Sequence, residues 1–166
     1  VEYASPYVEQ GASWTDNVDG SGYAYTGSYG NTGSFTLSGV VNTGALGTYI
    51  LEYNKVDVAG NATSAYRSVI VEDTTAPVVT LVGSGNFTLY QNSLYVESGA
   101  TWTDIHDGSG ALPGPYSGSV NTGSLGTYTL DYRYVDSAGN TGSVSRTVNV
   151  VAAPDTTPPV ITLIGS

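Results

Sequence analysis

The sequence contains no cysteine, no methionine and a single histidine among its 166 residues. The lack of cysteine excludes disulfides, thiolate chemistry and cysteine-based zinc sites, and one histidine leaves little scope for histidine-dependent catalysis. Only four Lys and Arg residues stand against 14 Asp and Glu residues, so the formal net charge is −10. A surface this acidic repels nucleic acid. No run approaches the roughly 18 consecutive apolar residues of a membrane span, so we expect none in this segment.

Four motifs occur twice, in the same order, and this duplication predicts two tandem domains of similar design. The pairs are GASWTD at 11–16 and GATWTD at 99–104, VNTGALGTY at 41–49 and VNTGSLGTY at 120–128, DVAGN at 57–61 and DSAGN at 136–140, and DTTAPVVTL at 73–81 and DTTPPVITL at 155–163. Because the four motifs occur in the same order in both copies, chance similarity does not explain them.

Within each repeat the apolar residues recur with a period of two, which is typical of strands. In the second copy Tyr128, Leu130, Tyr132 and Tyr134 alternate with polar residues. We interpret this tyrosine stripe as core packing, with a platform for stacking sugars as the alternative. The following motif, DSAGN, is a turn whose glycine can adopt a positive φ. Seven or so such strands per repeat and no helical stripe predict an all-β fold of two Ig-like antiparallel β-sandwiches.

Trp14 and Trp102 lie on early strands and are expected to supply large parts of the two cores. Lys55 occupies an inward-pointing position where the second repeat has Tyr134.

The repeat boundaries predict domain 1 at residues 1–72, domain 2 at 73–154 and an additional linker and strand at 155–166. Domain 1 lacks the first strand that domain 2 has after its linker. The closing segment either continues into another repeat or completes domain 1 of a neighbouring subunit by strand addition. Its strand residues are Val160, Ile161, Thr162, Leu163 and Ile164. Head-to-tail contacts that do not close would produce a filament.

The four ordered motifs together resemble the bacterial immunoglobulin-like repeats of large cell-surface and secreted proteins, akin to hyalin-type and cadherin-like repeats. The resemblance covers nearly the whole chain. It implies tandem Ig-like sandwiches in adhesins, surface-layer proteins, stalks or spacers of extracellular enzymes, and no catalysis. An extracellular or cell-surface location is the corresponding expectation.

Carboxylates gather in the loop after the tryptophan strand, in the DxAGN hairpin and in the linker. In an Ig-like sandwich these three places meet at one end. Oxygen ligands without a nearby cationic side chain suit Ca²⁺, so no cofactor is required but calcium is expected at the domain junctions. Alternatively, the same side chains cap turns by bonding their own backbone. The candidate ligands are Asp16, Asp19, Asp57, Asn61, Asp73, Asp104, Asp107, Asp136, Asn140 and Asp155.

Residues 20–38 form a longer segment than the equivalent part of the second repeat, and its tyrosines Tyr23, Tyr25 and Tyr29 are candidates for a surface contact. Extra loops on a scaffold often carry contacts. The alternative is a solvated hairpin.

No carboxylate lies in sequence apolar enough to raise its pKa for glycosidase chemistry, so we expect no enzyme. The sequence favours a structural repeat of an extracellular filament, stalk or surface-layer polymer whose partner is the protein itself, assembled head to tail. The alternatives are an adhesin or carbohydrate-binding module that uses exposed tyrosines for a glycan or surface ligand, or a spacer of an extracellular hydrolase.

Overall fold

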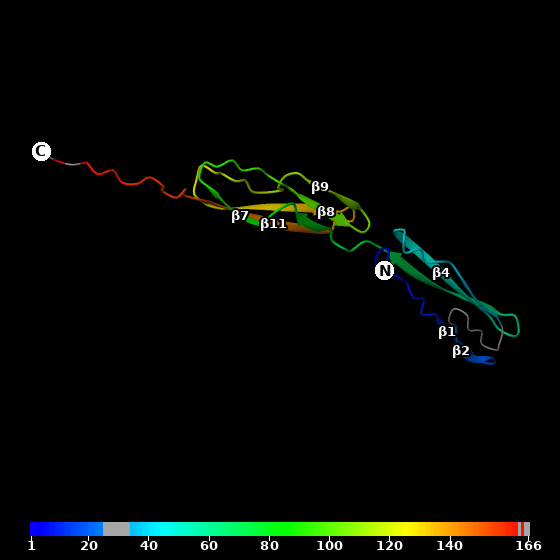
Figure 1. The fold of residues 1–166 in the computed structure, drawn as a ribbon. Coiled ribbons are helices and arrows are strands. Elements are labelled where there is room, and N and C mark those ends of the chain that lie inside the picture. The colour runs from blue at the N-terminus through cyan, green and yellow to red at the C-terminus, as the bar shows by residue number, and fades with distance from the viewer. Residues whose placement is uncertain (25–33, 163, 165–166) are drawn as a thin grey trace. The chain divides into compact units, whose positions relative to one another are not determined.

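A computed structural model describes residues 1–24, 34–162 and 164, and the chain divides into unit 1 (Val1–Thr75) and unit 2 (Ala76–Ser166). Every element in the described ranges is a strand, with antiparallel sheets in both units, and the predicted all-β class is thereby confirmed (Figure 1). The described residues include no helix with the length and apolarity needed to cross a membrane.

Unit 1 contains two antiparallel sheets. One pairs β1 (Ala12–Asp16) with β2 (Gly20–Ala24). The other has the order β3-β4-β5, formed by β3 (Ser34–Ser38), β4 (Gly47–Val56) and β5 (Ala62–Val71). Buried Leu51, Tyr53 and Val69 form the core between them.

Unit 2 also contains two sheets. The first has the order β6-β8-β9, formed by β6 (Val78–Leu81), β8 (Ala100–Asp104) and β9 (Gly108–Leu112). The second sheet has the order β10-β11-β7, formed by β7 (Asn86–Tyr90), β10 (Gly126–Val135) and β11 (Thr141–Val151), with β7 parallel to β11. In its described residues unit 2 differs from unit 1 in both sheets: the first has one strand more, and the third strand of the second lies beside β11, the counterpart of β5, rather than beside β10, the counterpart of β4.

The period-two pattern of β10 corresponds to alternating burial along the strand, as expected. Leu130 and Tyr132 are fully buried and form the core with Val79 and Ala100. The glycines of the DxAGN turns, Gly60 and Gly139, adopt φ of 94° and 97°, which confirms the predicted turn. The described strands number five in unit 1 and six in unit 2, fewer than seven, because the extended residues 93–98 and their counterparts before β1 form no ladder.

The two tryptophans differ in their surroundings. Trp102 stacks on Tyr134 with ring centroids 3.7 Å apart and packs against the core of unit 2. Trp14 is half-buried, and the Lys55 ammonium group lies 4.4 Å from the centre of its ring. Lys55 is buried, as its inward position predicts, and it replaces aromatic stacking with a cation–π contact.

The closing segment forms no strand over its described residues, 155–162 and 164. Val160 and Ile161 are each 89% exposed and Ile164 is fully exposed. Leu163 lies outside the described residues, as do Tyr25 and Tyr29 of the longer segment in unit 1. Tyr23, the remaining tyrosine singled out in that segment, is 70% exposed.

Candidate cation site

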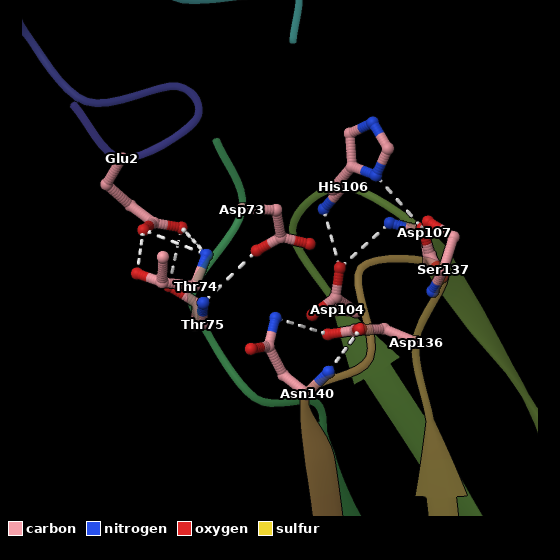
Figure 2. A network of polar contacts seen from close by, with 10 residues as sticks. All are labelled: Glu2, Asp73, Thr74, Thr75, Asp104, His106, Asp107, Asp136, Ser137 and Asn140. Carbon is pink, nitrogen blue, oxygen red and sulfur yellow. Dashed lines mark hydrogen bonds and ion pairs between the residues drawn. The ribbon is translucent and has the colours of Figure 1, made fainter. Parts of the chain in front are cut away.

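The loop between β8 and β9 is closed by Asp104, the last residue of β8. Its Oδ1 atom accepts hydrogen bonds from the backbone N–H groups of His106 and Asp107, both at 2.8 Å (Figure 2). Unit 1 repeats this geometry at Asp16, whose Oδ1 accepts from Val18 and Asp19 at 2.8 Å. These backbone bonds lower the pKa of Asp16. One carboxylate oxygen of each residue therefore closes a turn.

The second carboxylate oxygen of Asp104 has a different environment. Its Oδ2 atom is buried and has no hydrogen-bond partner among the described residues. A buried acceptor without a donor is costly, because the water it lost on folding is not replaced. One carboxylate oxygen of Asp104 also lies within 4.8 Å of one of Asp136. Two carboxylates this close repel each other unless a cation or a proton lies between them.

Asp136 opens the hairpin between β10 and β11 and is itself buried. Its two carboxylate oxygens accept from the backbone N–H and the side-chain amide of Asn140, at 2.7 and 2.9 Å. In unit 1, Asp57 accepts the same pair of bonds from Asn61, both at 2.7 Å, and the Asn61 side chain is the main cause that lowers the pKa of Asp57. Asn61 and Asn140, whose side chains also carry an amide oxygen, each lie in the same hairpin turn as the aspartate they bond to.

A third aspartate in each unit ties the loop to the hairpin. Asp107 accepts from the backbone N–H and the hydroxyl of Ser137, both at 2.6 Å, and these bonds lower its pKa. Asp19 accepts from the backbone N–H of Val58 at 2.8 Å. The structure thus brings together Asp104, Asp107, Asp136 and Asn140 in unit 2, and Asp16, Asp19, Asp57 and Asn61 in unit 1.

The two linker aspartates each close a short turn. Asp73 accepts from the N–H of Thr75 at 3.1 Å, and Asp155 from that of Thr157 at 2.8 Å. Asp155 is exposed and is not brought to the other candidate ligands. Glu2, which sequence reasoning did not single out, accepts from Thr74 and from the Thr75 hydroxyl and so fixes the start of the linker to unit 1 (Figure 2).

The two sites differ in whether a lysine side chain lies near the carboxylates. In unit 1 the positive charge of Lys55 contributes to the lowered pKa of Asp16. Unit 2 has Tyr134 at the matching position, so this local source of positive charge is absent from the site of unit 2. The chemistry of the donor set, carboxylate and amide oxygens only, suits a hard divalent cation better in unit 2 than in unit 1.

A second polar cluster, which occurs in each unit and is more deeply buried in unit 2, was not predicted. In unit 2 the Glu97 carboxylate accepts from Tyr95 (2.5 Å), Tyr132 (2.6 Å), Arg146 (2.5 Å) and the N–H of Gly99 (2.6 Å). Burial alone would raise the pKa of Glu97, but the bonds from the two tyrosines and Gly99 and the Arg146 charge outweigh it, so the pKa is lowered.

Unit 1 has the matching cluster of Tyr7, Glu9, Tyr53 and Arg67. Burial and the Glu9 carboxylate raise the pKa of Tyr53 to about 12. The sequence signal was the repeated YxExG pattern at 7–11 and 95–99, together with two of only four basic residues at matching places. We assign this cluster a structural role, because its members form hydrogen bonds to one another.

Comparison with known proteins gives the same organisation. The family model described as "Bacterial surface protein, Ig-like domain" matches residues 1–71 and again 79–150. Hyalin from Strongylocentrotus purpuratus is 38% identical over 129 residues, covering 70% of this chain and 10% of hyalin. An uncharacterised 81.3 kDa protein of Acholeplasma phage L2 is 28% identical over 149 residues, covering 86% of this chain and 20% of that protein. The chain therefore spans a fifth or less of the curated relatives it matches.

The predicted resemblance to bacterial immunoglobulin-like repeats is confirmed by these matches. Both matched segments coincide with the sheets of one unit each. Because the family model covers most of the chain, the chain belongs to the bacterial surface protein Ig-like domain family, of which it carries two successive copies.

Proposed function

We propose that this chain is a non-catalytic structural segment of an extracellular filament, stalk or surface-layer polymer, built from repeats arranged head to tail. The observation that carries this proposal is the way a linker leads into a repeat. The strand after the first linker, β6, joins the first sheet of unit 2 as its edge strand. The linker and strand sequence then occurs again at 155–163, after β11. A chain in which each domain is followed by the linker and first-strand sequence of a further domain is suited to a linear array of repeats.

The joint between repeats is stabilised by Ca²⁺. The register of the first sheet supports this part of the proposal, because Val78 of β6 pairs with Thr103, the residue before Asp104. Asp104 and Asp136 therefore lie at the end of the sheet where the chain enters the repeat. These two carboxylates, with Asp107 and Asn140 beside them, are ligands of the kind that Ca²⁺ takes in sites of 6–8 oxygens.

Calcium titration tests the joint. We expect 1 mM CaCl₂ to raise the melting temperature of the whole chain by several degrees relative to EDTA, since ligand at 100 times its dissociation constant stabilises by about 2.7 kcal/mol. The variant Asp104→Asn should lose this response. The matched control is Asp131→Asn, which removes a half-buried carboxylate of β10 that accepts from Ser117 and Ser145. An unchanged melting temperature on adding calcium to the wild type would remove the metal from the proposal.

Electron microscopy of the natural full-length protein tests the array itself. We expect a linear string of beads, with each bead the size of one Ig-like domain. A compact particle in which the repeats do not follow one another in a line would contradict the proposal.

A second candidate is a glycan-binding or adhesive module, favoured by large exposed aromatic side chains. Tyr23, Tyr66 and Tyr116 are 66–70% exposed, and such rings provide faces on which sugars stack. A glycan array distinguishes the two functions, because a structural segment gives no sugar-specific signal, whereas a binding module loses its signal on replacement of these tyrosines by serine.

A further inference from the structure

The hairpin motifs of the two units differ in the charge of the residue that precedes them. The sequence reads KVDVAGN at 55–61 in unit 1 and YVDSAGN at 134–140 in unit 2. Lys55 and Tyr134 occupy matching places, because each lies two residues before the aspartate of the hairpin and contacts the tryptophan of its unit. A cationic side chain therefore lies in unit 1 where unit 2 has an aromatic ring.

The Lys55 ammonium group is surrounded by acceptors. Lys55 is 8% exposed, and a lysine buried this deeply keeps its charge only where acceptors or anions lie close to it. Its Nζ atom donates to the carbonyl oxygen of Val56 at 2.8 Å and lies 4.4 Å from the centre of the Trp14 ring. Asp16 and Asp57 line the same small hollow as Lys55. The positive charge is thus placed beside the carboxylates of the unit 1 site.

This charge acts on the carboxylates as a bound cation would. Backbone bonds from Asp19 and Val18 are the main reason why the pKa of Asp16 is lowered; beyond them, the Asp57 charge raises this pKa and the Lys55 charge lowers it. The ammonium group therefore offsets the repulsion between the two carboxylates. The same ammonium group repels a divalent cation, with twice the energy that it would have against a monovalent one.

Unit 2 has no such charge at the matching place. The Tyr134 ring stacks on Trp102, with ring centroids 3.7 Å apart. Arg133, the next residue along β10, has its guanidinium group 5.4 Å from the centre of the exposed Tyr116 ring. Asp104 and Asp136 nevertheless have carboxylate oxygens within 4.8 Å of each other, and Oδ2 of Asp104 is buried without a hydrogen-bond partner among the described residues. These oxygens are left to a cation from solution.

We propose that Lys55 is the built-in cation of unit 1: its ammonium group holds the β1–β2 loop and the β4–β5 hairpin together without metal, whereas the matching site of unit 2 takes a divalent cation. This inference rests on the calcium site proposed above and restricts that site to one of the two units. Withdrawal of calcium then weakens unit 2 and leaves unit 1 unchanged, so the two repeats differ in their dependence on the metal.

Calcium titration of the whole chain, followed by the amide signals of Gly60 and Gly139 in the two hairpin turns, measures the two sites separately. We expect Gly139 to shift with calcium, and Gly60 to shift only at concentrations at least tenfold higher. Tyr134→Lys should weaken the calcium affinity measured at Gly139 by tenfold or more. Lys55→Tyr should strengthen the affinity measured at Gly60 by a similar factor. Lys55→Met should do the same and keeps a long unbranched side chain against the Trp14 ring.

Three control variants separate the position of the charge from its mere presence. Lys55→Arg keeps the charge and should leave Gly60 as insensitive as in the wild type. Thr129→Lys adds a charge at an exposed position of β10, five residues before Tyr134, and should change the affinity at Gly139 by about twofold at most. His106→Val should also change it by about twofold at most; it removes the imidazole whose Nδ1 atom lies 3.0 Å from Asp107 Oδ1 and introduces the unit 1 residue, Val18.

Equal calcium affinity of the two sites in the wild type would overturn the inference. A Gly60 signal that stays insensitive in both Lys55→Tyr and Lys55→Met would also overturn it, as would equal weakening at Gly139 by Thr129→Lys and Tyr134→Lys.

Urea denaturation in EDTA tests the built-in cation without calcium. Asp16→Asn removes an anion that Lys55 attracts, so the unfolding equilibrium constant of unit 1 should rise by about threefold. Asp104→Asn relieves the repulsion from Asp136, so that of unit 2 should fall by a similar factor. Asparagine keeps the oxygen that closes each turn. A wild-type chain that binds no calcium, with opposite effects of these two variants, would overturn the calcium site and leave the role of Lys55 standing. Destabilisation of both units would overturn the role of Lys55.

Discussion

Glu97 is the residue on which the hydrogen bonds of the unit 2 cluster converge. Its pKa is lowered in the folded chain because the tyrosine and Gly99 bonds and the Arg146 charge outweigh the effect of burial. A carboxylate with a depressed folded pKa stabilises the protein fully above the ordinary glutamate value of about 4.3, and this contribution is lost as the pH falls through the folded value. We therefore expect the free energy of unfolding of unit 2 to fall steeply below about pH 4.

The variant Glu97→Gln should remove much of that acid sensitivity and cost about 3 kcal/mol at pH 7, because the buried Arg146 charge is left without its partner. Urea denaturation from pH 7 to pH 3 measures both effects. Asp131→Asn, at a carboxylate outside the cluster, is the control that should keep the steep acid loss. An acid limb in Glu97→Gln as steep as in the wild type would contradict this assignment.

The two arginines are expected to differ in their contribution to stability. Arg146 is 1% exposed, and Arg67, at the matching place, is 35% exposed. We expect Arg146→Gln to cost unit 2 about 3 kcal/mol and Arg67→Gln to cost unit 1 about 1 kcal/mol, because solvent screens the partly exposed ion pair. Amide signals assigned to each unit, followed through a urea titration, would measure the loss of unfolding free energy in that unit. Equal losses in the two units would show that the exposure of the arginine does not govern its contribution to stability.

At the scale of the element, β6 depends on the absence of a side chain at Gly142. A Cβ atom there would meet the Pro77 carbonyl oxygen at 1.8 Å, and a backbone atom cannot rotate aside. Gly142→Ala is therefore expected to displace the start of β6 and to destabilise unit 2 by about 1–3 kcal/mol. Hydrogen exchange of the β6 amides should become faster. Gly114→Ala is the control, since a Cβ atom on Gly114 meets nothing within 4 Å.

The strands and turns could be predicted from the sequence because their signals are local. Leu130 and Tyr132 alternate with polar neighbours, and the DxAGN motif places a glycine where φ is positive, so a short window contains the information. The sequence analysis expected the loop after the tryptophan strand and the DxAGN hairpin to lie at one end of the sandwich, and the bond between Asp107 and Ser137, 30 positions apart, joins these two segments.

The buried polar clusters could not be predicted in the same way. The bond from Arg146 to Glu97 joins residues 49 positions apart, and in a strand pattern both residues read as polar surface positions. Their burial follows from three-dimensional packing between sheets. The use of Asp104 Oδ1 for its own turn, with Oδ2 buried and unpartnered, is likewise a matter of side-chain orientation, which the sequence pattern does not encode.

At the scale of the whole molecule, the net charge of −10 opposes any association of copies. Salt shortens the range of this repulsion from about 10 Å at 0.1 M ionic strength to about 3 Å at 1 M. We expect sedimentation in EDTA to show tighter self-association at 0.5 M NaCl than at 0.05 M NaCl. Weaker association at high salt would mean that ion pairs, rather than apolar contacts, hold the copies together.

The parallel pairing of β7 with β11 has a mechanical consequence. Five consecutive residues of β7, from Asn86 to Tyr90, lie alongside residues 147–151 near the end of β11. Because the two strands run the same way, tension applied through the entering and leaving chain pulls them in opposite directions along their length. Their hydrogen bonds are then sheared together instead of being peeled apart in succession, an arrangement that resists force well.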